Sequence, residues 1–336
     1  MNLRICGTRL HTWSGLLSII LVSSCHFHAS AEPKRGSLNV LIENDLFYGL
    51  DRNYTNGFAI SWTPHPEDTV DWTGKLFGRL PWVPETSEMR RTYALGQNIY
   101  TPSDISLASP LSTDRPYAGW LYGAMGVASQ SGTLLDQLQV QVGVVGPASL
   151  AEQTQTLVHE LADAIPPQGW DMQLQNELGV NLIYQRSWKA LQGELSPGFD
   201  YDLTTHVGGA FGNVFTYANS GAMMRVGLNL TDDFGPNRIQ PSLPGTAYFD
   251  SSEDKSFYVF AGFDGRAVAR NIFLDGNTWQ HSRSVEKRPF VADVEIGVAF
   301  HLGRARIAYT HVFRSQEFES ADERDEFGAI SLSFGY

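Results

Sequence analysis

The chain has 336 residues, of which 42% are hydrophobic and 18% are charged, and its formal net charge is −12. The charged fraction is below the roughly 25% that is usual for soluble domains, and together with 32 glycines it disfavours a disordered chain or a coiled coil. The excess of 36 Asp and Glu over 24 Lys and Arg argues against a nucleic-acid partner, because phosphate backbones are bound by basic side chains.

The first residues have the pattern of an export signal. Arg4 and Arg9 precede an apolar run, and small residues then end in an A-x-A sequence at Ala31, which is the order found in secretory signal peptides. We therefore expect residues 1–31 to be removed, and with them both cysteines of the chain, which excludes a disulfide framework. The alternative is a lipoprotein signal, in which Cys25 would become the lipidated first residue.

The rest of the chain alternates between apolar and polar residues. In 293–302, for example, Val294 and Ile296 alternate with Asp293 and Glu295, and this period of two is typical of a strand. Carboxylates on the polar face disfavour the dry interior of a soluble β-sandwich and favour a hydrated lumen. Twelve such segments are predicted, at 37–44, 55–63, 90–100, 117–129, 134–146, 171–187, 197–211, 220–230, 256–270, 288–302, 304–316 and 327–336.

These segments predict an all-β fold, a transmembrane antiparallel up-and-down β-barrel of about twelve strands formed by residues 32–336. No apolar stretch after the signal reaches the ~18 residues of a membrane helix, and an even number of strands is usual in bacterial outer-membrane barrels. The chain ends on an alternating strand with Tyr336 as its last residue. This ending resembles the signal that the barrel-assembly machinery reads, whereas a soluble sandwich is the alternative fold.

Strand parity assigns the connections to the two sides of the membrane. With both termini in the periplasm, connections that follow odd-numbered strands face outwards. The connections at 64–89 and 231–255 are then expected to be long periplasmic loops. We expect an outer-membrane, monomeric protein whose candidate site faces the outer leaflet.

Oxygen-bearing side chains cluster in the first predicted hairpin. Asn44 and Asp45 end its first strand, and Thr55 lies near the start of its second. Hard cations such as Ca²⁺ bind carboxylate and carbonyl oxygens, so Asp45 is a candidate ligand. Asn and Asp are also frequent in turns for purely structural reasons, and no contiguous EF-hand spacing is present.

One helix is predicted between the fifth and sixth strands. Ser149 and Glu152 have the spacing of a capping box, and Pro166 marks the end of the pattern. Gln155 and His159 are four residues apart and share one helix face. A surface histidine without a catalytic role is the alternative interpretation.

The sequence contains no G-x-S-x-G, H-E-x-x-H or phosphate-binding glycine motif. If the protein is an enzyme, water is therefore the expected nucleophile. A neutral His159 acting as general base, together with Ca²⁺ and amide donors that polarise a carbonyl, would hydrolyse an ester.

The ordered motifs of the chain resemble those of the LpxR-type lipid A 3′-O-deacylases, over most of the exported part. They are Glu43-Asn44-Asp45, the segment 51–57, Gln97 to Pro102, Asp114 to Tyr122, Gly143 to Pro147, Gln155 with His159, and Gly169-Trp170.

The resemblance implies a twelve-stranded outer-membrane barrel with a calcium-dependent site near the outer leaflet, which removes the 3′-linked acyloxyacyl group from lipid A. By motif, Asp45 is the expected calcium ligand, His159 the expected base, and Asn44, Thr55 and Gln155 further catalytic residues. The family's lysine after the Thr-Pro motif has no counterpart here, and Arg115 is the candidate to bind substrate phosphate instead, unless its role is structural.

The expected partners are thus lipid A or lipopolysaccharide as substrate, outer-membrane lipid and the barrel-assembly machinery. Two other functions remain open at this point. They are a passive outer-membrane pore and an outer-membrane phospholipase.

Overall fold

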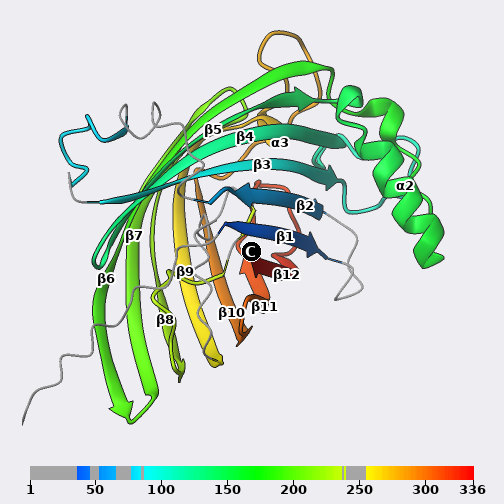
Figure 1. The fold of residues 1–336 in the computed structure, drawn as a ribbon. Helices are drawn as coiled ribbons and strands as arrows, with labels where there is room; N and C mark the ends of the chain where they lie inside the picture. The colour runs from blue at the N-terminus through cyan, green and yellow to red at the C-terminus, as the bar shows by residue number, and fades with distance from the viewer. Residues whose placement is uncertain (1–35, 46–52, 66–76, 85–86, 237, 240–254) are drawn as a thin grey trace, which may run out of the picture. The chain divides into compact units, whose positions relative to one another are not determined.

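Twelve antiparallel strands form a closed barrel in which each strand pairs with its neighbours in the chain and β1 pairs with β12 (Figure 1). The predicted fold class is confirmed. The computed structural model describes residues 36–45, 53–65, 77–84, 87–236, 238–239 and 255–336, so the predicted signal lies outside the described residues. The strands are β1 (Ser37–Asn44), β2 (Asn53–Thr63), β3 (Glu88–Thr101), β4 (Ala118–Ser131), β5 (Leu134–Val145), β6 (Glu177–Ser196), β7 (Phe199–Gly212), β8 (Phe215–Leu228), β9 (Ser256–Asn271), β10 (Phe290–Leu302), β11 (Ala305–Arg314) and β12 (Asp325–Gly335).

The predicted strands agree with these bounds to within two residues except at β8, which was predicted at 220–230 but runs over Phe215–Leu228, and at β6. This strand was predicted at 171–187 but runs over Glu177–Ser196. Its first predicted residues belong to a 3₁₀ turn, η4 (Trp170–Met172). At the other end, the pairing with β7 shifts register between Lys189 and Leu191, and such a bulge interrupts the alternation on which the prediction relied.

The alternation does place polar residues inside and apolar residues outside. In β10, Asp293 and Glu295 are buried in the lumen, whereas Val294 and Ile296 are about half exposed on the outer surface. Among the described residues, no helix has the length and apolar character needed to cross a membrane.

The polar interior of the barrel contains charged side chains that pair with one another. Asp293 accepts hydrogen bonds from Arg266 at 2.8 Å and from Arg314 at 2.9 Å. Arg238 donates to Glu295 at 2.6 Å. Buried charges are tolerated when each has an opposite partner, and these pairs accommodate the carboxylates of the polar face.

The connection between β8 and β9 enters this interior, which corrects the expectation of a periplasmic loop for its described residues, 231–236 and 238–239. Asp233 accepts hydrogen bonds from Arg225 and, at 2.6 Å, from Arg306. Burial alone would raise the pKa of Asp233, but these two guanidinium groups hold its pKa well below the usual value. The Ile239 backbone N–H donates to Glu43 Oε1 at 3.0 Å, which ties the connection to β1.

The other part of the lumen is closed by aromatic rings. The short helix α3 (Ile272–Asp275) places Phe273 inside the barrel, where its ring stacks on Tyr100 with centroids 4.0 Å apart. The two rings belong to the largest buried apolar cluster, which also contains Trp120 and Phe215. The barrel is therefore a packed core surrounded by a sheet.

Candidate active site

The helix α2 (Ala151–Ala162) lies against the outside of the barrel wall, beside the ends of β3 and β4 (Figure 1). Gln97 Nε2 donates to the Ser149 carbonyl at 2.7 Å and fixes the segment that precedes the helix. A Cβ on Gly119 would lie 2.0 Å from Ser149 Oγ and 2.3 Å from Ala151 Cβ. Glycine is therefore needed on β4 for α2 to approach this closely. We call this end of the barrel the α2 rim.

The helix begins differently from the predicted capping box. Ser149 belongs to a 3₁₀ turn, η3 (Pro147–Ser149), and Leu150 occupies the N-cap position with φ 60° and no side-chain cap. The contact of Ser149 with the wall thus outweighs the local capping preference. The predicted helix itself and the shared face of Gln155 and His159 are as expected.

A small pocket lies between α2 and the wall. In β1, Glu43 points into the lumen, so Asn44 points outwards, and here the helix covers it. The pocket therefore opens on the outer face of the barrel. The residues that line it are Asn44, Thr55, Asn56, Ile99, Thr154, Gln155, Val158 and His159.

His159 is buried, and its orientation is fixed by a contact within its own segment. Asp163 ends the helix with φ 52°, and the chain folds back so that the Ile165 carbonyl lies 2.6 Å from His159 Nδ1. A carbonyl only accepts, so Nδ1 carries the proton and donates it. In the neutral ring the basic lone pair is then on Nε2.

Gln155 is held by a residue for which the sequence suggested no such role. The Trp170 Nε1–H donates to Gln155 Oε1 at 2.8 Å, and both side chains are buried. The Trp170 ring packs on Tyr117, with centroids 4.8 Å apart. Within the described part of the chain, Gln155 Nε2 has no hydrogen-bond partner. The amide thus offers two donor hydrogens inside a buried pocket.

The first hairpin supplies oxygen atoms near the pocket. Thr55 Oγ1 lies 2.6 Å from Thr101 Oγ1, and the Asp45 backbone N–H donates to the Thr55 carbonyl at 3.4 Å. Asp45 is buried and follows Asn44 directly. No group of three or more His, Cys, Asp or Glu side chains suited to a metal is found among the described residues. One carboxylate with neutral amide, hydroxyl and carbonyl oxygens nevertheless suits the chemistry of Ca²⁺.

The structure does not bring Arg115 into this pocket. Arg115 is fully buried, its Nη1 donates to Glu317 at 3.3 Å, and its guanidinium lies 5.1 Å from the centroid of the Tyr100 ring. These partners belong to the barrel interior. The contacts of Arg115 therefore favour a structural role over binding of substrate phosphate.

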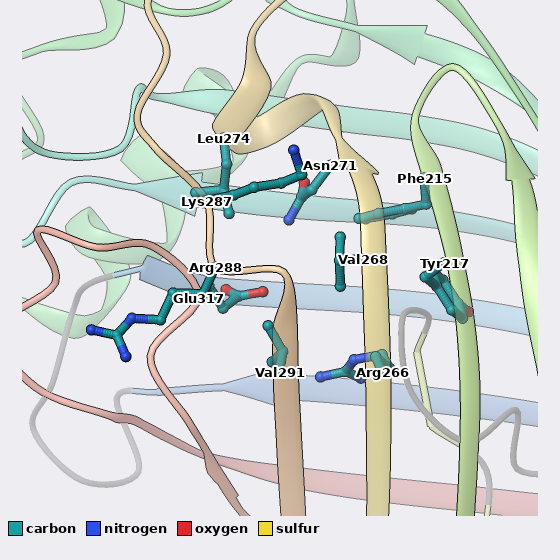
Figure 2. A pocket seen from close by; sticks show the side chains of 10 residues that line it. All are labelled: Phe215, Tyr217, Arg266, Val268, Asn271, Leu274, Lys287, Arg288, Val291 and Glu317. Atoms are coloured by element: carbon teal, nitrogen blue, oxygen red, sulfur yellow. The ribbon is translucent and has the colours of Figure 1, made fainter.

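A second pocket lies inside the barrel, between β8, β9 and β10 (Figure 2). Its charged groups have opposite partners, since Arg266 pairs with Asp293 at 2.8 Å and Lys287 with Asp275 at 2.8 Å. We assign no reaction to it. Its lining residues are Phe215, Tyr217, Arg266, Val268, Asn271, Leu274, Lys287, Arg288, Val291 and Glu317.

Sequence reasoning missed several contributors to the site on the outer wall. Gly169-Trp170 was among the motifs of the family resemblance, but nothing in the sequence indicated that Trp170 would hold Gln155. The Ile165 carbonyl could not have been found, since its place depends on the reversal of the chain at Asp163. Nor does a local pattern distinguish Ile99 and Val158 from ordinary core residues.

The comparisons with known proteins agree with this architecture. One family model, described as outer membrane protein LpxR, matches residues 16–336. The solved structure of LpxR from Salmonella typhimurium has a TM-score of 0.72 and 20% identity, and the match covers 89% of this chain and 100% of that chain. No match is found among the curated proteins.

Two autotransporter barrels are less similar to this chain. The β domain of Brka from Bordetella has a TM-score of 0.44 and 8% identity, over 91% of this chain and 99% of that chain. The translocator domain of NalP from Neisseria meningitidis has a TM-score of 0.38 and 8% identity, over 91% and 90%. With a family match over nearly all its length and the fold of a solved member, the chain belongs to the LpxR family of outer-membrane proteins.

Proposed function

We propose that the chain is a calcium-dependent esterase that removes the 3′-O-linked acyloxyacyl group from lipid A in the outer leaflet. One observation carries the proposal. His159, with Nδ1 fixed on the Ile165 carbonyl, lines the same pocket as Asn44, Thr55 and Gln155, on the outer face of the wall where a membrane lipid has access. A general base beside amide and hydroxyl donors is the set that ester hydrolysis by water requires.

In this proposal His159 Nε2 accepts a proton from water while the water oxygen attacks the ester carbonyl carbon. The carbonyl oxygen gains negative charge, and Gln155 Nε2, Asn44 or Thr55 donates a hydrogen bond to it. When the carbon–oxygen bond to the sugar breaks, the His159 imidazolium returns the proton to the leaving oxygen. The products are a free carboxylic acid and a sugar hydroxyl.

The calcium site of the proposal is formed by Asp45 together with neighbouring neutral oxygens. The carboxylate of Asp45 and the amide oxygen of Asn44 are the side-chain groups assigned to hold the ion. Bound calcium supplies positive charge that polarises the ester carbonyl. Asn44 thus connects the ion site to the pocket, since it lines the pocket and precedes Asp45 directly.

The two other candidate functions differ in how much support they have. A passive pore has none from the described residues, because Phe273 and residues 231–236 and 238–239 occupy the lumen. A phospholipase needs the same base and oxygens as a lipid A esterase, so only the substrate distinguishes the two.

Mass spectrometry of lipids from cells with and without this chain tests the proposal. We expect lipid A to lose the mass of one acyloxyacyl group only when the chain is present and calcium is not chelated. Loss of acyl groups from phospholipids with intact lipid A would assign the phospholipase function instead. Unchanged lipids of both kinds would contradict an esterase.

Trp170 is expected to act as a positioning residue for Gln155. Trp170→Phe retains an aromatic ring against Tyr117 but removes the N–H that orients the amide. The net value of one hydrogen bond is about 0.5–1.5 kcal/mol, so kcat should fall about 2- to 12-fold with little change in KM. Steady-state kinetics on a lipid A substrate measures both constants.

A double-mutant cycle separates positioning from general damage to the fold. In a Gln155→Ala background, Trp170→Phe should cause no further loss, because the amide it orients is gone. Additive losses would instead mean that Trp170 acts independently of Gln155. Trp279→Phe is the matched control, since Trp279 is exposed and outside the pocket.

A further inference from the structure

The helix α2 carries its large apolar side chains on the face that points away from the barrel. Leu150, Leu157 and Leu161 are 53%, 56% and 81% exposed, and Ile165 just beyond the helix is 64% exposed. Leu157 and Leu161 are four residues apart and lie on one side of the helix, and Leu150 and Ile165 flank its two ends. We call these four residues the leucine face.

This arrangement is the reverse of that in a helix that packs on a water-soluble protein. There the apolar stripe covers the core and the polar residues face solvent. In α2 the polar residues Gln155 and His159 are buried against the wall, and the leucine face has no covering group among the described residues. An apolar stripe of this kind marks a surface that another apolar phase covers.

The outer surface of the barrel next to the pocket identifies that phase. Ile42 on β1 and Phe58 on β2 are 40% and 41% exposed and pair directly with one another. Two residues further towards the rim, Asn44 pairs with Asn56, and both line the pocket. Since the chain belongs to an outer-membrane family, the exposed apolar rows of the wall face lipid. The leucine face stands beside the same pocket.

We propose that the leucine face of α2 is inserted among the lipid acyl chains of the leaflet at this rim, so that α2 is an interfacial membrane helix. Glu152 lies on the opposite side of the helix and is exposed. Its charge adds no attraction to an anionic membrane surface, so apolar burial is the force that holds the helix there. The pocket then opens sideways into lipid, and its substrate enters without leaving the membrane.

Photo-crosslinking in the intact outer membrane tests the placement without reference to catalysis. A benzophenone amino acid is incorporated in the full chain at position 161, at position 58 as a lipid-facing reference, and at position 152 as the matched control on the other side of α2. After irradiation, we expect position 161 to capture lipid at a level comparable to position 58, and position 152 to capture several-fold less.

Two results would overturn the proposal. Lipid capture at position 161 no greater than at position 152 would place the leucine face in water. Capture of a second copy of the chain, seen as a crosslinked dimer, would mean that a protein surface covers the leucine face.

A kinetic test depends also on the proposed function. The double variant Leu157→Gln/Leu161→Gln should lower acyl release from lipid A in bilayers about tenfold, because apolar burial is lost, and leave release in detergent micelles unchanged. Equal losses in bilayers and micelles would contradict membrane insertion while leaving the esterase proposal intact. No release by the parent chain in either medium would contradict the esterase proposal alone.

Discussion

His159→Asn lowers the rate of acyl release from lipid A by about 10²–10⁴-fold, the usual contribution of a general base. The asparagine amide can still donate to the Ile165 carbonyl in place of Nδ1–H, so the segment after α2 keeps its anchor. What is lost is the basic lone pair of Nε2. Release of the free acid by the purified variant, followed by mass spectrometry, measures the rate.

His281→Asn is the matched control for this variant, because His281 is exposed and does not line the pocket. Both variants should migrate as folded barrels in unheated gel electrophoresis, since neither residue takes part in strand pairing. A His159→Asn protein that is folded and releases acid at the parent rate would remove His159 as the base.

Asp45→Asn raises the calcium concentration needed for half-maximal activity by on the order of 100-fold, because a carboxylate is replaced by a neutral amide of the same shape. In calcium-free buffer the parent chain should lose activity and recover it when calcium is added back. The rate of acyl release across a calcium titration measures the shift. Calcium should also raise the unfolding temperature of the parent but not of the variant, a readout independent of catalysis.

Asp104→Asn is the control that separates this effect from general loss of negative charge. Asp104 is exposed, and its carboxylate accepts hydrogen bonds from Ser106 in its own loop. Its calcium dependence should equal that of the parent. Full activity of the parent after thorough chelation would exclude calcium from the reaction, and an unshifted titration in Asp45→Asn would exclude Asp45 as a ligand.

The fold could be predicted from the sequence because the two faces of each barrel strand lie in different environments, and each strand carries this difference in its own residues. A residue such as Val294 meets an apolar outer phase and its neighbour Glu295 meets the interior, and this alternation is visible without knowing the partner strand. Pairing of each strand with the next then follows from the up-and-down order of an antiparallel barrel. The predicted bounds differ by more than two residues only at β6 and β8, and each of these strands contains a register shift, at Lys189 in β6 and at Thr216 in β8, that interrupts the period.

The content of the lumen could not be predicted, because it depends on groups far apart in the chain. Asp233 is an ordinary loop residue until it meets Arg225 and Arg306, which come from different strands. The carboxylates on the polar faces of the predicted strands therefore indicated a polar lumen but not the groups with which they pair. The arginines that neutralise them were present in the sequence, but nothing local assigns each to its carboxylate.

Part of the candidate site could likewise be predicted from the sequence, and part of it could not. A shared helix face for Gln155 and His159 follows from their spacing, and the closeness of Asn44 to Thr55 follows from the hairpin. Strand parity places the helix in an outward-facing connection, but neither parity nor the family resemblance predicted that α2 would fold onto the outside of the wall beside that hairpin. Neither local spacing nor the family resemblance predicted the ion pair of Arg115 with Glu317, because these residues are 202 positions apart in the sequence.

In β1, two consecutive residues lie on opposite sides of the barrel wall. Glu43 accepts a hydrogen bond from Ile239 on the inner side, and the next residue, Asn44, belongs to the pocket on the outer side. Rearranging the inner segment is therefore expected to tilt the end of β1 and displace Asn44, a residue of the proposed site, across the wall. If the proposed esterase function holds, substitutions at Ile239 should behave in genetic screens like substitutions in the pocket itself, although Ile239 lies on the other side of the wall.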